Sequence, residues 1–295
     1  MTHGGPDPDA DGARADMDFA GVDRPSRVAL PADPRLAQAL GEAMPGWPRH
    51  PASRPQAADV TVLCEDETCR VVATSWPGGE ALANDPLSTA NALAGLLVDA
   101  QLIRASRLVA LHAAVAVFPA GAVVMLGGTE AGKSTLALRL AARGLCAFGD
   151  DRVLVDTNGT AGTEVVALGL AAKARLPLPV GDAGLDGFVE RHAALWVGDA
   201  VWLNGGAMAP FGARAPLAAF VVLDRRPDVE VARLEILGAG PLAARLIEQA
   251  TAPADGAAAL VARVARLAAG GGQRLVYADG MAACDVLAGR FGAIR

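Results

Sequence analysis

Lysine is the scarcest charged residue in this chain of 295 residues. Only two of its 26 basic side chains are lysines, Lys133 and Lys173, and the other 24 are arginines. Such a bias is typical of a GC-rich coding sequence, in which arginine replaces lysine wherever either serves. A lysine is a compact point charge and an arginine a wide planar fork, so each of the two retained lysines is a candidate for a position that needs the compact charge.

Other scarcities exclude whole classes of protein. The net charge is −6, so the chain lacks the basic excess of a general nucleic-acid binder. Four cysteines are too few for a disulfide scaffold, and Cys64 and Cys69 lack the second Cys/His pair that a zinc site needs. We therefore predict free, buried thiols. With 52% apolar residues, global disorder is excluded.

The chain also lacks an uninterrupted membrane-spanning run. Leu108–Leu126 is nearly apolar, but it contains His112, and Pro119–Gly121 divides it into two short runs. Short β-branched runs around such a turn predict a hairpin of two buried strands. Met1–Gly21 is acidic and has no apolar segment, so we expect no signal peptide and a cytoplasmic location.

The pattern along the chain predicts three parts. Residues 1–26 form an acidic tail that we expect to be disordered. Residues 27–106 form a small α+β module, with strands at 60–64 and 70–75 and a helix over 88–103 that Ser88 or Thr89 caps. Residues 107–295 alternate strands and helices, which indicates an α/β domain.

The second domain carries most of the expected elements. We predict strands at 123–126, 145–148, 153–155, 165–168, 217–223 and 274–277, and helices over 133–143, 241–249, 257–267 and 281–291. Gly181–Ala209 is rich in glycine and is interpreted as a mobile acceptor-binding loop.

Residues 127–134 match the pattern G-x-x-x-x-G-K-[ST] of a phosphate-binding loop, or P-loop. Its glycines allow backbone N–H groups to surround phosphate oxygens, and the following helix adds its positive end. Lys133 is predicted to reach the β- and γ-phosphates, and Ser134 to offer a hydroxyl to Mg²⁺. The predicted nucleotide-binding residues are Gly127, Gly128, Thr129, Glu130, Ala131, Gly132, Lys133, Ser134 and Thr135.

An acidic pair, Asp150-Asp151, follows Lys133 by only 17 and 18 residues. One helix and a tight turn would bring the chain back in a strand beside the loop, with both carboxylates at the ligand-binding edge of the sheet. One carboxylate can hold Mg²⁺ and the other can accept a proton from an attacking hydroxyl. Asp224, at the end of the strand over 217–223, is a competing metal ligand, although Arg225 and Arg226 could simply pair with it.

Residues 111–156 resemble the HPr kinase/phosphorylase family, whose nucleotide-binding core is similar to that of phosphoenolpyruvate carboxykinases. The stretch holds a histidine-bearing strand, a hairpin into the P-loop and an Asp-Asp-Arg run. The resemblance implies a P-loop-containing mixed sheet flanked by helices, and assembly into homo-oligomers. It also implies that His112 approaches the phosphates and that Asp151 or Asp150 is the general base; without it, His112 would read as a buried core histidine.

Some positions depart from that family. Thr135 stands where HPr kinases usually carry an acidic residue, and the Gly-rich signature of phosphorylase-competent enzymes is missing. The chain therefore resembles an HPr-kinase relative rather than a true HPr kinase. Such relatives include kinases that act on peptides and kinases that act on free serine.

Lys173 and Arg175 would share one face if their segment is extended. Together with Arg152 they are candidates for contact with the phosphates or the acceptor; the alternative for Lys173 is a solvated guard at a strand edge.

The sequence thus predicts an ATP- and Mg²⁺-dependent kinase that transfers the γ-phosphoryl group to a hydroxyl, a serine of a peptide or protein. The predicted catalytic residues are His112, Lys133, Asp150 and Asp151, and the predicted metal ligands are Ser134 and Asp150. The alternatives are a small-molecule kinase of the serine type and a non-catalytic ATP-binding regulatory module. Neither nucleic acid nor membrane is an expected partner.

Overall fold

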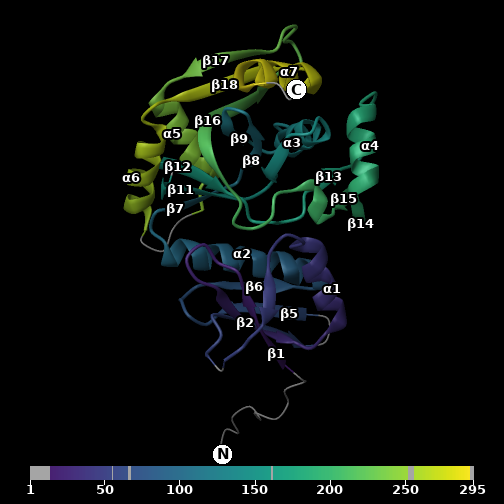
Figure 1. Cartoon of the computed structure of the whole chain (residues 1–295), viewed down its shortest axis with the longest axis vertical. Coiled ribbons are helices and arrows are strands. Elements are labelled where there is room, and N and C mark those ends of the chain that lie inside the picture. The colour runs from purple at the N-terminus through teal and green to yellow at the C-terminus, as the bar shows by residue number, and fades with distance from the viewer. Residues whose placement is uncertain (1–13, 55, 66–67, 161, 252–255, 293–295) are drawn as a thin grey trace, which may run out of the picture. The chain divides into compact units, whose positions relative to one another are not determined.

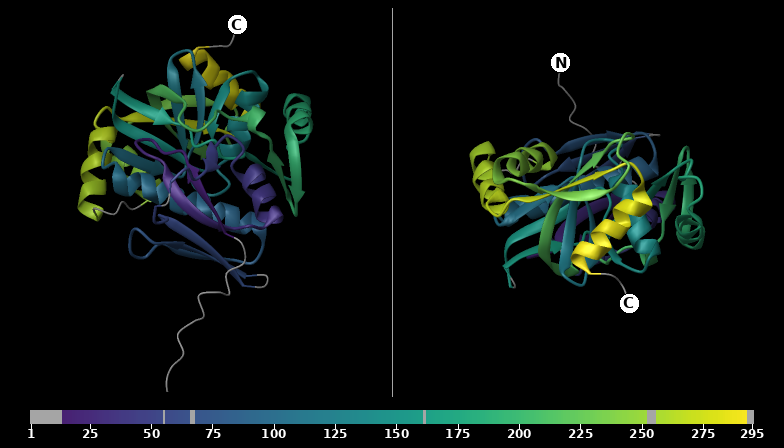
Figure 2. Two further views of the ribbon diagram at one scale, coloured as in Figure 1. Left: turned by 60° about the horizontal axis from the view of Figure 1, so that its bottom comes forward. Right: turned by 90° about the horizontal axis from the view of Figure 1, so that it is seen from above.

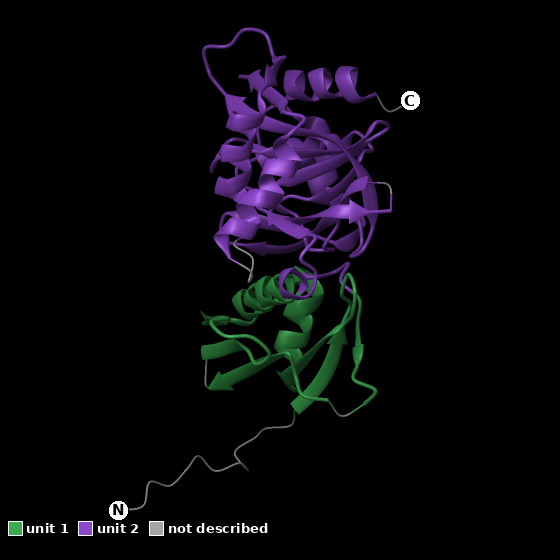
Figure 3. Ribbon diagram, turned by 90° about the vertical axis from the view of Figure 1, so that its left-hand side faces the viewer, with its two compact units in different colours: residues 1–43, 48–100 green, residues 44–47, 101–295 purple. Residues whose placement is uncertain are grey.

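The structure, a computed structural model, describes residues 14–54, 56–65, 68–160, 162–251 and 256–292. Within these residues the chain is a mixed α/β protein with seven α-helices and three sheets, which confirms the predicted class (Figure 1). It divides into two compact units that meet in sequence between Ala100 and Gln101, and Met44–Trp47 belongs to the second unit (Figure 3). Every helix in the described part is too short or too polar to span a bilayer.

The first unit holds a six-stranded sheet with the order β3-β1-β2-β4-β5-β6, in which only β2 and β4 are parallel. Its elements are β1 (Arg14–Phe19), β2 (Ser26–Pro31), α1 (Pro34–Ala43), β3 (Arg49–Pro51), β4 (Val60–Glu65), β5 (Thr68–Ala73), β6 (Glu80–Ala83) and α2 (Pro86–Arg104), whose last turn lies beyond the unit boundary.

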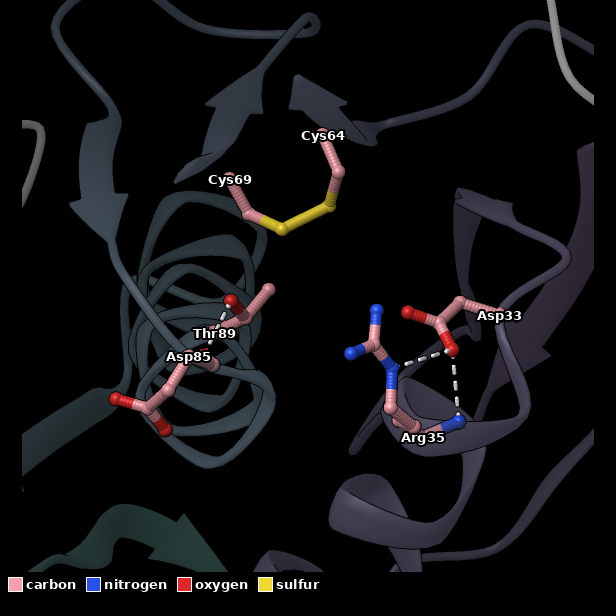
Figure 4. Close-up of a disulfide and its surroundings, with 6 residues drawn as sticks. All are labelled: Asp33, Arg35, Cys64, Cys69, Asp85 and Thr89. Atoms are coloured by element: carbon pink, nitrogen blue, oxygen red, sulfur yellow. Dashed lines mark hydrogen bonds and ion pairs between the residues drawn. A yellow bond between two sulfur atoms is a disulfide. The ribbon is translucent and has the colours of Figure 1, made fainter. Parts of the chain in front are cut away.

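Three predictions about the first unit are wrong. The expected disordered tail includes β1, which pairs with β2 and β3; residues 1–13 lie outside the described residues. Asp85 caps α2 in place of Ser88 or Thr89, because its Oδ1 accepts the Ser88 N–H at 2.9 Å. Cys64 and Cys69 form a disulfide, since the β4–β5 hairpin sets them directly opposite each other (Figure 4).

The second unit is built on a nine-stranded mixed sheet. The order runs β10-β8-β9-β16-β12-β11-β7. In addition, β18 pairs with β16, and β17 pairs with β18. Its strands are β7 (Leu108–Leu111), β8 (Ala114–Phe118), β9 (Gly121–Leu126), β10 (Cys146–Gly149), β11 (Val153–Gly159), β12 (Gly162–Val166), β16 (Arg214–Arg225), β17 (Arg233–Leu237) and β18 (Gly272–Tyr277).

Helices cover both faces of this sheet (Figures 1 and 2). Side chains alternate along β9: Val124 and Leu126 pack with α5 (Ala239–Gln249) and α6 (Ala257–Ala268), and Val123 and Met125 pack with α3 (Lys133–Ala142) and α7 (Gly280–Phe291). This period of two explains why the strand is buried along its whole length. The predicted elements of this domain are found, with bounds that agree within three residues except at the C-terminal end of β11, which extends four residues further.

Two connections differ from the prediction. The run before Pro119 holds two strands, because the chain breaks at His112-Ala113 so that β7 can pair with β11 while β8 pairs with β9. β10 pairs with β8, which separates it from β9. Because β8 is antiparallel to both, β9 and β10 run in the same direction and end at the same edge of the sheet, as expected.

The segment 181–209 is not a loop. It forms α4 (Ala183–His192), β14 (Ala193–Val197), β15 (Ala200–Leu203) and the short η1 (Gly205–Ala207). β15 pairs with β14 and with β13 (Lys173–Arg175) in a three-stranded sheet, and α4 packs against α3 through a small apolar core. Leucine, phenylalanine and valine spaced along α4 supply the buried face that the glycine count obscured. The thiol of Cys146 is exposed, against expectation, while Cys284 is buried.

Candidate functional site

The segment Gly127–Ser134 connects β9 to α3 in a tight loop. Gly132, at the N-cap of α3, has φ +87°, and a Cβ there would lie 2.7 Å from the Tyr277 hydroxyl oxygen. A Cβ at Gly127 would lie 2.8 Å from that of Ala131. Glu130 also has a positive φ, 64°, which is costly for a residue with a side chain. The loop therefore needs glycine where the pattern places it, and it holds backbone strain of the kind found at ligand sites.

Lys133 is a buried cation without a carboxylate partner in the described part of the chain. Its side chain is 7% exposed, and its Nζ donates to the carbonyl oxygens of Gly127 and Gly128 at 2.7 and 3.2 Å. Burial lowers the pKa of the ammonium, an effect that the charge of Asp151 opposes. Buried charges are usually paired, so this ammonium is placed to receive an anion at the loop.

The acidic pair follows β10 and lies beside the loop. The Ser134 hydroxyl donates to the main-chain oxygen of Asp150 at 3.2 Å, which joins the start of α3 to the end of β10. The Asp150 carboxylate is 6% exposed and accepts the main-chain N–H of Lys173 at 2.9 Å. Burial raises the pKa of Asp150 to about 6, and the N–H of Lys173 opposes this rise. Asp150 is thus a buried carboxyl that carries its charge near neutral pH.

Asp151 differs from its neighbour. Its side chain is 48% exposed, and its Oδ1 lies 3.0 Å from Nδ1 of His112, which is also about half exposed. The hydrogen bond with His112 holds the pKa of Asp151 below its ordinary value, although burial acts the other way. His112 is therefore not a buried core histidine: it occupies the break between β7 and β8 and orients an ionised, accessible carboxylate.

The second lysine lies against the same pair. The Lys173 Nζ is 4.0 Å from the centroid of the Trp202 ring, and its pKa is lowered by burial and raised by the charges of Asp151 and Asp150. Lys173 lies on β13, an edge strand of the three-stranded sheet, and is partly buried there, so the alternative of a guard at a strand edge stays open. Arg152 is 3.9 Å from Asp151, whereas Arg175 is exposed on β13 and has no contact of this kind in the described part.

Two further expectations concern metal ligands. Asp224 is 2.9 Å from Arg274 and 3.1 Å from Arg226, so the simpler pairing with arginine holds. No group of three or more His, Cys, Asp or Glu side chains in the described residues could hold a metal ion by itself. A magnesium site here would need ligands beyond these side chains, and Mg²⁺ bound through one or two protein ligands and substrate phosphates meets that condition.

One residue of the site has no counterpart among the sequence-based predictions. Tyr277, at the end of β18, donates its hydroxyl to the Ala131 oxygen at 2.6 Å and so supports the loop from 146 residues away in sequence. Its burial raises the pKa of the phenol to about 12. Tyr277 is the only tyrosine in the chain, and that rarity was a signal that could have singled it out.

Comparisons with known proteins give little further information about this site. No family model matches the chain, and no curated protein matches it. Among solved structures, the chain is similar to the HPr(Ser) kinase/phosphatase from Coxiella burnetii, with a TM-score of 0.31 and 11% sequence identity over 61% of this chain and 95% of that one. A similarity this distant carries no conclusion about the site.

Proposed function

We propose that the chain is an ATP-dependent kinase that transfers the γ-phosphoryl group to a hydroxyl, a serine of a peptide or protein acceptor. The observation that carries the proposal is the buried Lys133 ammonium, which meets only carbonyl oxygens of its own loop, beside the carboxylates of Asp150 and Asp151. A binding loop alone would not need an ionised, accessible carboxylate at its side. Asp151 is such a group.

The residues present fit both ATP and Mg²⁺. The strained glycine loop and the first turn of α3 offer backbone N–H groups, and Lys133 offers a positive charge, for the phosphates. Ser134 and Asp150 would hold Mg²⁺, which when bound neutralises charge that develops on the phosphate oxygens. The link between the Ser134 hydroxyl and the Asp150 main chain keeps these two residues together.

Asp151 has the clearest task in the transfer. The acceptor hydroxyl gives its proton to the Asp151 carboxylate while its oxygen forms a bond to the γ-phosphorus, and the bond between that phosphorus and the β,γ-bridging oxygen breaks to leave ADP. His112 holds the carboxylate in place through Nδ1. Lys173, fixed over Trp202, adds positive charge beside the pair.

Incubation with γ-labelled ATP and Mg²⁺ tests this function. Candidate acceptors are serine-containing peptides, proteins encoded by neighbouring genes, and free serine. We expect label on an acceptor hydroxyl from the wild type and a loss of about 100- to 10,000-fold with Asp151→Asn, which is the contribution of a positioned general base. ATP affinity and melting temperature should change little, since the Asp151 side chain is half exposed. Unchanged transfer by the variant would remove Asp151 from the mechanism.

A non-catalytic ATP-binding regulator is the second candidate. Thr135 in place of an acidic residue, and the engagement of Lys133 by loop carbonyls, favour it. Label that appears only in free phosphate or stays in ATP with every acceptor would support this candidate. Label on free serine alone would support a small-molecule kinase.

A further inference from the structure

A cavity of about 190 Å³ opens beside the loop. One wall is a face of α3, where Gly132, Thr135 and Arg139 follow one another at helical spacing. The facing wall is Tyr277–Gly280, the connection from β18 into α7. The cavity does not include His112, Asp150, Asp151 or Lys173, so it adjoins the phosphate loop without reaching the proposed proton acceptor.

The walls of this cavity are held in place by specific contacts. The Arg139 Nε lies 2.5 Å from Oδ2 of Asp182, and these side chains are 13% and 11% exposed. A Cβ at Gly280 would lie only 1.7 Å from Nη1 of Arg139, so glycine leaves the space that the guanidinium fills. The Tyr277 hydroxyl ties the facing wall to Ala131 in the loop. These contacts fix the positions of the residues on both walls, so the shape of the cavity is defined by the fold.

The lining combines apolar surface with donors and acceptors. Leu136 and Val180 are apolar, and the Arg139 guanidinium offers a planar group on which an aromatic ring can stack. Arg225 has no ion pair with any described residue. Asp279 uses Oδ1 to accept the Ala282 N–H at 2.8 Å, and its second oxygen accepts no hydrogen bond from the described residues. A flat ring joined to a group rich in hydroxyls matches this lining.

We propose that the cavity binds the nucleoside end of the nucleotide. The proposal rests on the proposed function, because it takes the phosphates to lie in the Gly127–Ser134 loop. The base packs on the α3 wall at Thr135 and Arg139, and the ribose hydroxyls meet Arg225 and Asp279. The acceptor is excluded from this cavity, because the acceptor hydroxyl must reach Asp151, which does not line it.

Titration calorimetry measures the affinities of two ligands, ATP and inorganic tripolyphosphate, each with Mg²⁺. Because tripolyphosphate lacks the nucleoside, the comparison distinguishes contacts to the nucleoside from contacts to the phosphates. The variant Arg225→Ala removes a lining cation. Arg226→Ala is its matched control, because Arg226 pairs with Asp224 and does not line the cavity. Ala278→Phe fills the cavity instead, and it supplies a second test by a different route.

The wild type should bind ATP at least about 10-fold more tightly than tripolyphosphate, since the phosphates alone leave the cavity empty. We expect Arg225→Ala to weaken ATP about 10-fold, the loss typical of a hydrogen bond to a charged group, and to leave tripolyphosphate within about 2-fold. Ala278→Phe should do the same, and Arg226→Ala should change neither.

Equal losses for ATP and tripolyphosphate in Arg225→Ala would place Arg225 on the phosphates and overturn its assignment to the nucleoside. Tight ATP binding that neither Arg225→Ala nor Ala278→Phe weakens would overturn the nucleoside site and leave the proposed kinase intact. Failure of the wild type to bind either ligand would overturn both.

Discussion

Two groups of charged side chains lie at opposite ends of the strand pair β7 and β11. At one end, beside the loop, His112 follows β7 and Asp150-Asp151 precede β11; with Lys133 and Lys173 we call this the loop group. At the other end, Asp156 stands opposite Leu108 in the same pairing register. It forms the far group with Glu164, Arg107 and Arg214.

The two groups satisfy their charges in different ways. In the far group, Oδ2 of Asp156 lies 3.1 Å from both Arg107 and Arg214, and Glu164 lies 3.0 Å from Arg214. In the loop group, Lys133 meets carbonyl oxygens and Asp150 meets a main-chain N–H. Removal of one partner from a carboxylate–arginine pair leaves a buried charge uncompensated and destabilises the fold, whereas Lys133 and Asp150, which have no side-chain partner of opposite charge within ion-pair distance in the described residues, are candidates for contact with a ligand. From this difference we propose a structural role for the far group and a binding role for the loop group.

Lys133→Met should break the loop group with the largest effect on binding. If Lys133 binds the phosphates as proposed, removal of the ammonium eliminates the charge that holds them, so ATP affinity should fall by at least about 100-fold. Stability should be unchanged or slightly higher, because a buried charge without a carboxylate partner disappears. Calorimetric titration and thermal melting measure the two quantities. A destabilised variant with wild-type affinity for ATP would make Lys133 a structural residue and remove the contrast with the far group.

Asp156→Asn should show the opposite pattern. The variant removes a carboxylate that two arginines share and that is only 2% exposed itself. We expect a loss of about 2 kcal/mol in the free energy of unfolding, below the usual range for a broken buried pair because both arginines are about one-third exposed. Denaturant unfolding measures this loss, and ATP affinity below the melting temperature should remain within about 2-fold. A large loss of affinity with full stability would connect the far group to the ligand.

Asp150→Asn sharpens the comparison through pH. Burial raises the pKa of Asp150 from its ordinary 3.8 to about 6, so the folded chain binds this proton more tightly than the unfolded chain. The resulting stabilisation is fully present below about pH 4 and is lost as the pH rises through 6. At pH 7, without nucleotide or metal, the variant should be more stable than the wild type by about 3 kcal/mol, and the difference should vanish near pH 4. Unfolding curves at several pH values measure it, and parallel curves for the two proteins would contradict the assignment.

The part of the site that lies close together in sequence was predictable. The glycine spacing around Lys133 demanded a strained loop, and the 17 residues to Asp150 left room for one helix and one strand back to the same edge. Period-two burial in β9 explains why the preceding strand could be placed as well.

Contacts from distant parts of the chain were not predictable. Nothing local to Tyr277 indicates that its hydroxyl bonds Ala131, and nothing near Lys173 indicates the Trp202 ring beneath it. The insertion of β8 between β9 and β10 also depends on pairing across the whole sheet, which a periodic pattern does not encode. The break at His112 was missed for the same reason, since both strands around it are equally apolar.

Lys173→Arg should have the smallest effect on phosphoryl transfer. It tests whether the second lysine of the chain is retained for a function or by chance. The ammonium lies 4.0 Å from the Trp202 ring centroid and beside the acidic pair, whereas a guanidinium is wider and would spread over the ring. Charge is retained, so we expect the transfer rate to fall only about 3- to 10-fold, with ATP affinity and stability unchanged. Arg175→Lys, on the same strand but exposed, is the matched control and should have no effect. Wild-type rates for both variants would mean that Lys173 persists by chance, and the loop group would then include a single lysine with a function, Lys133.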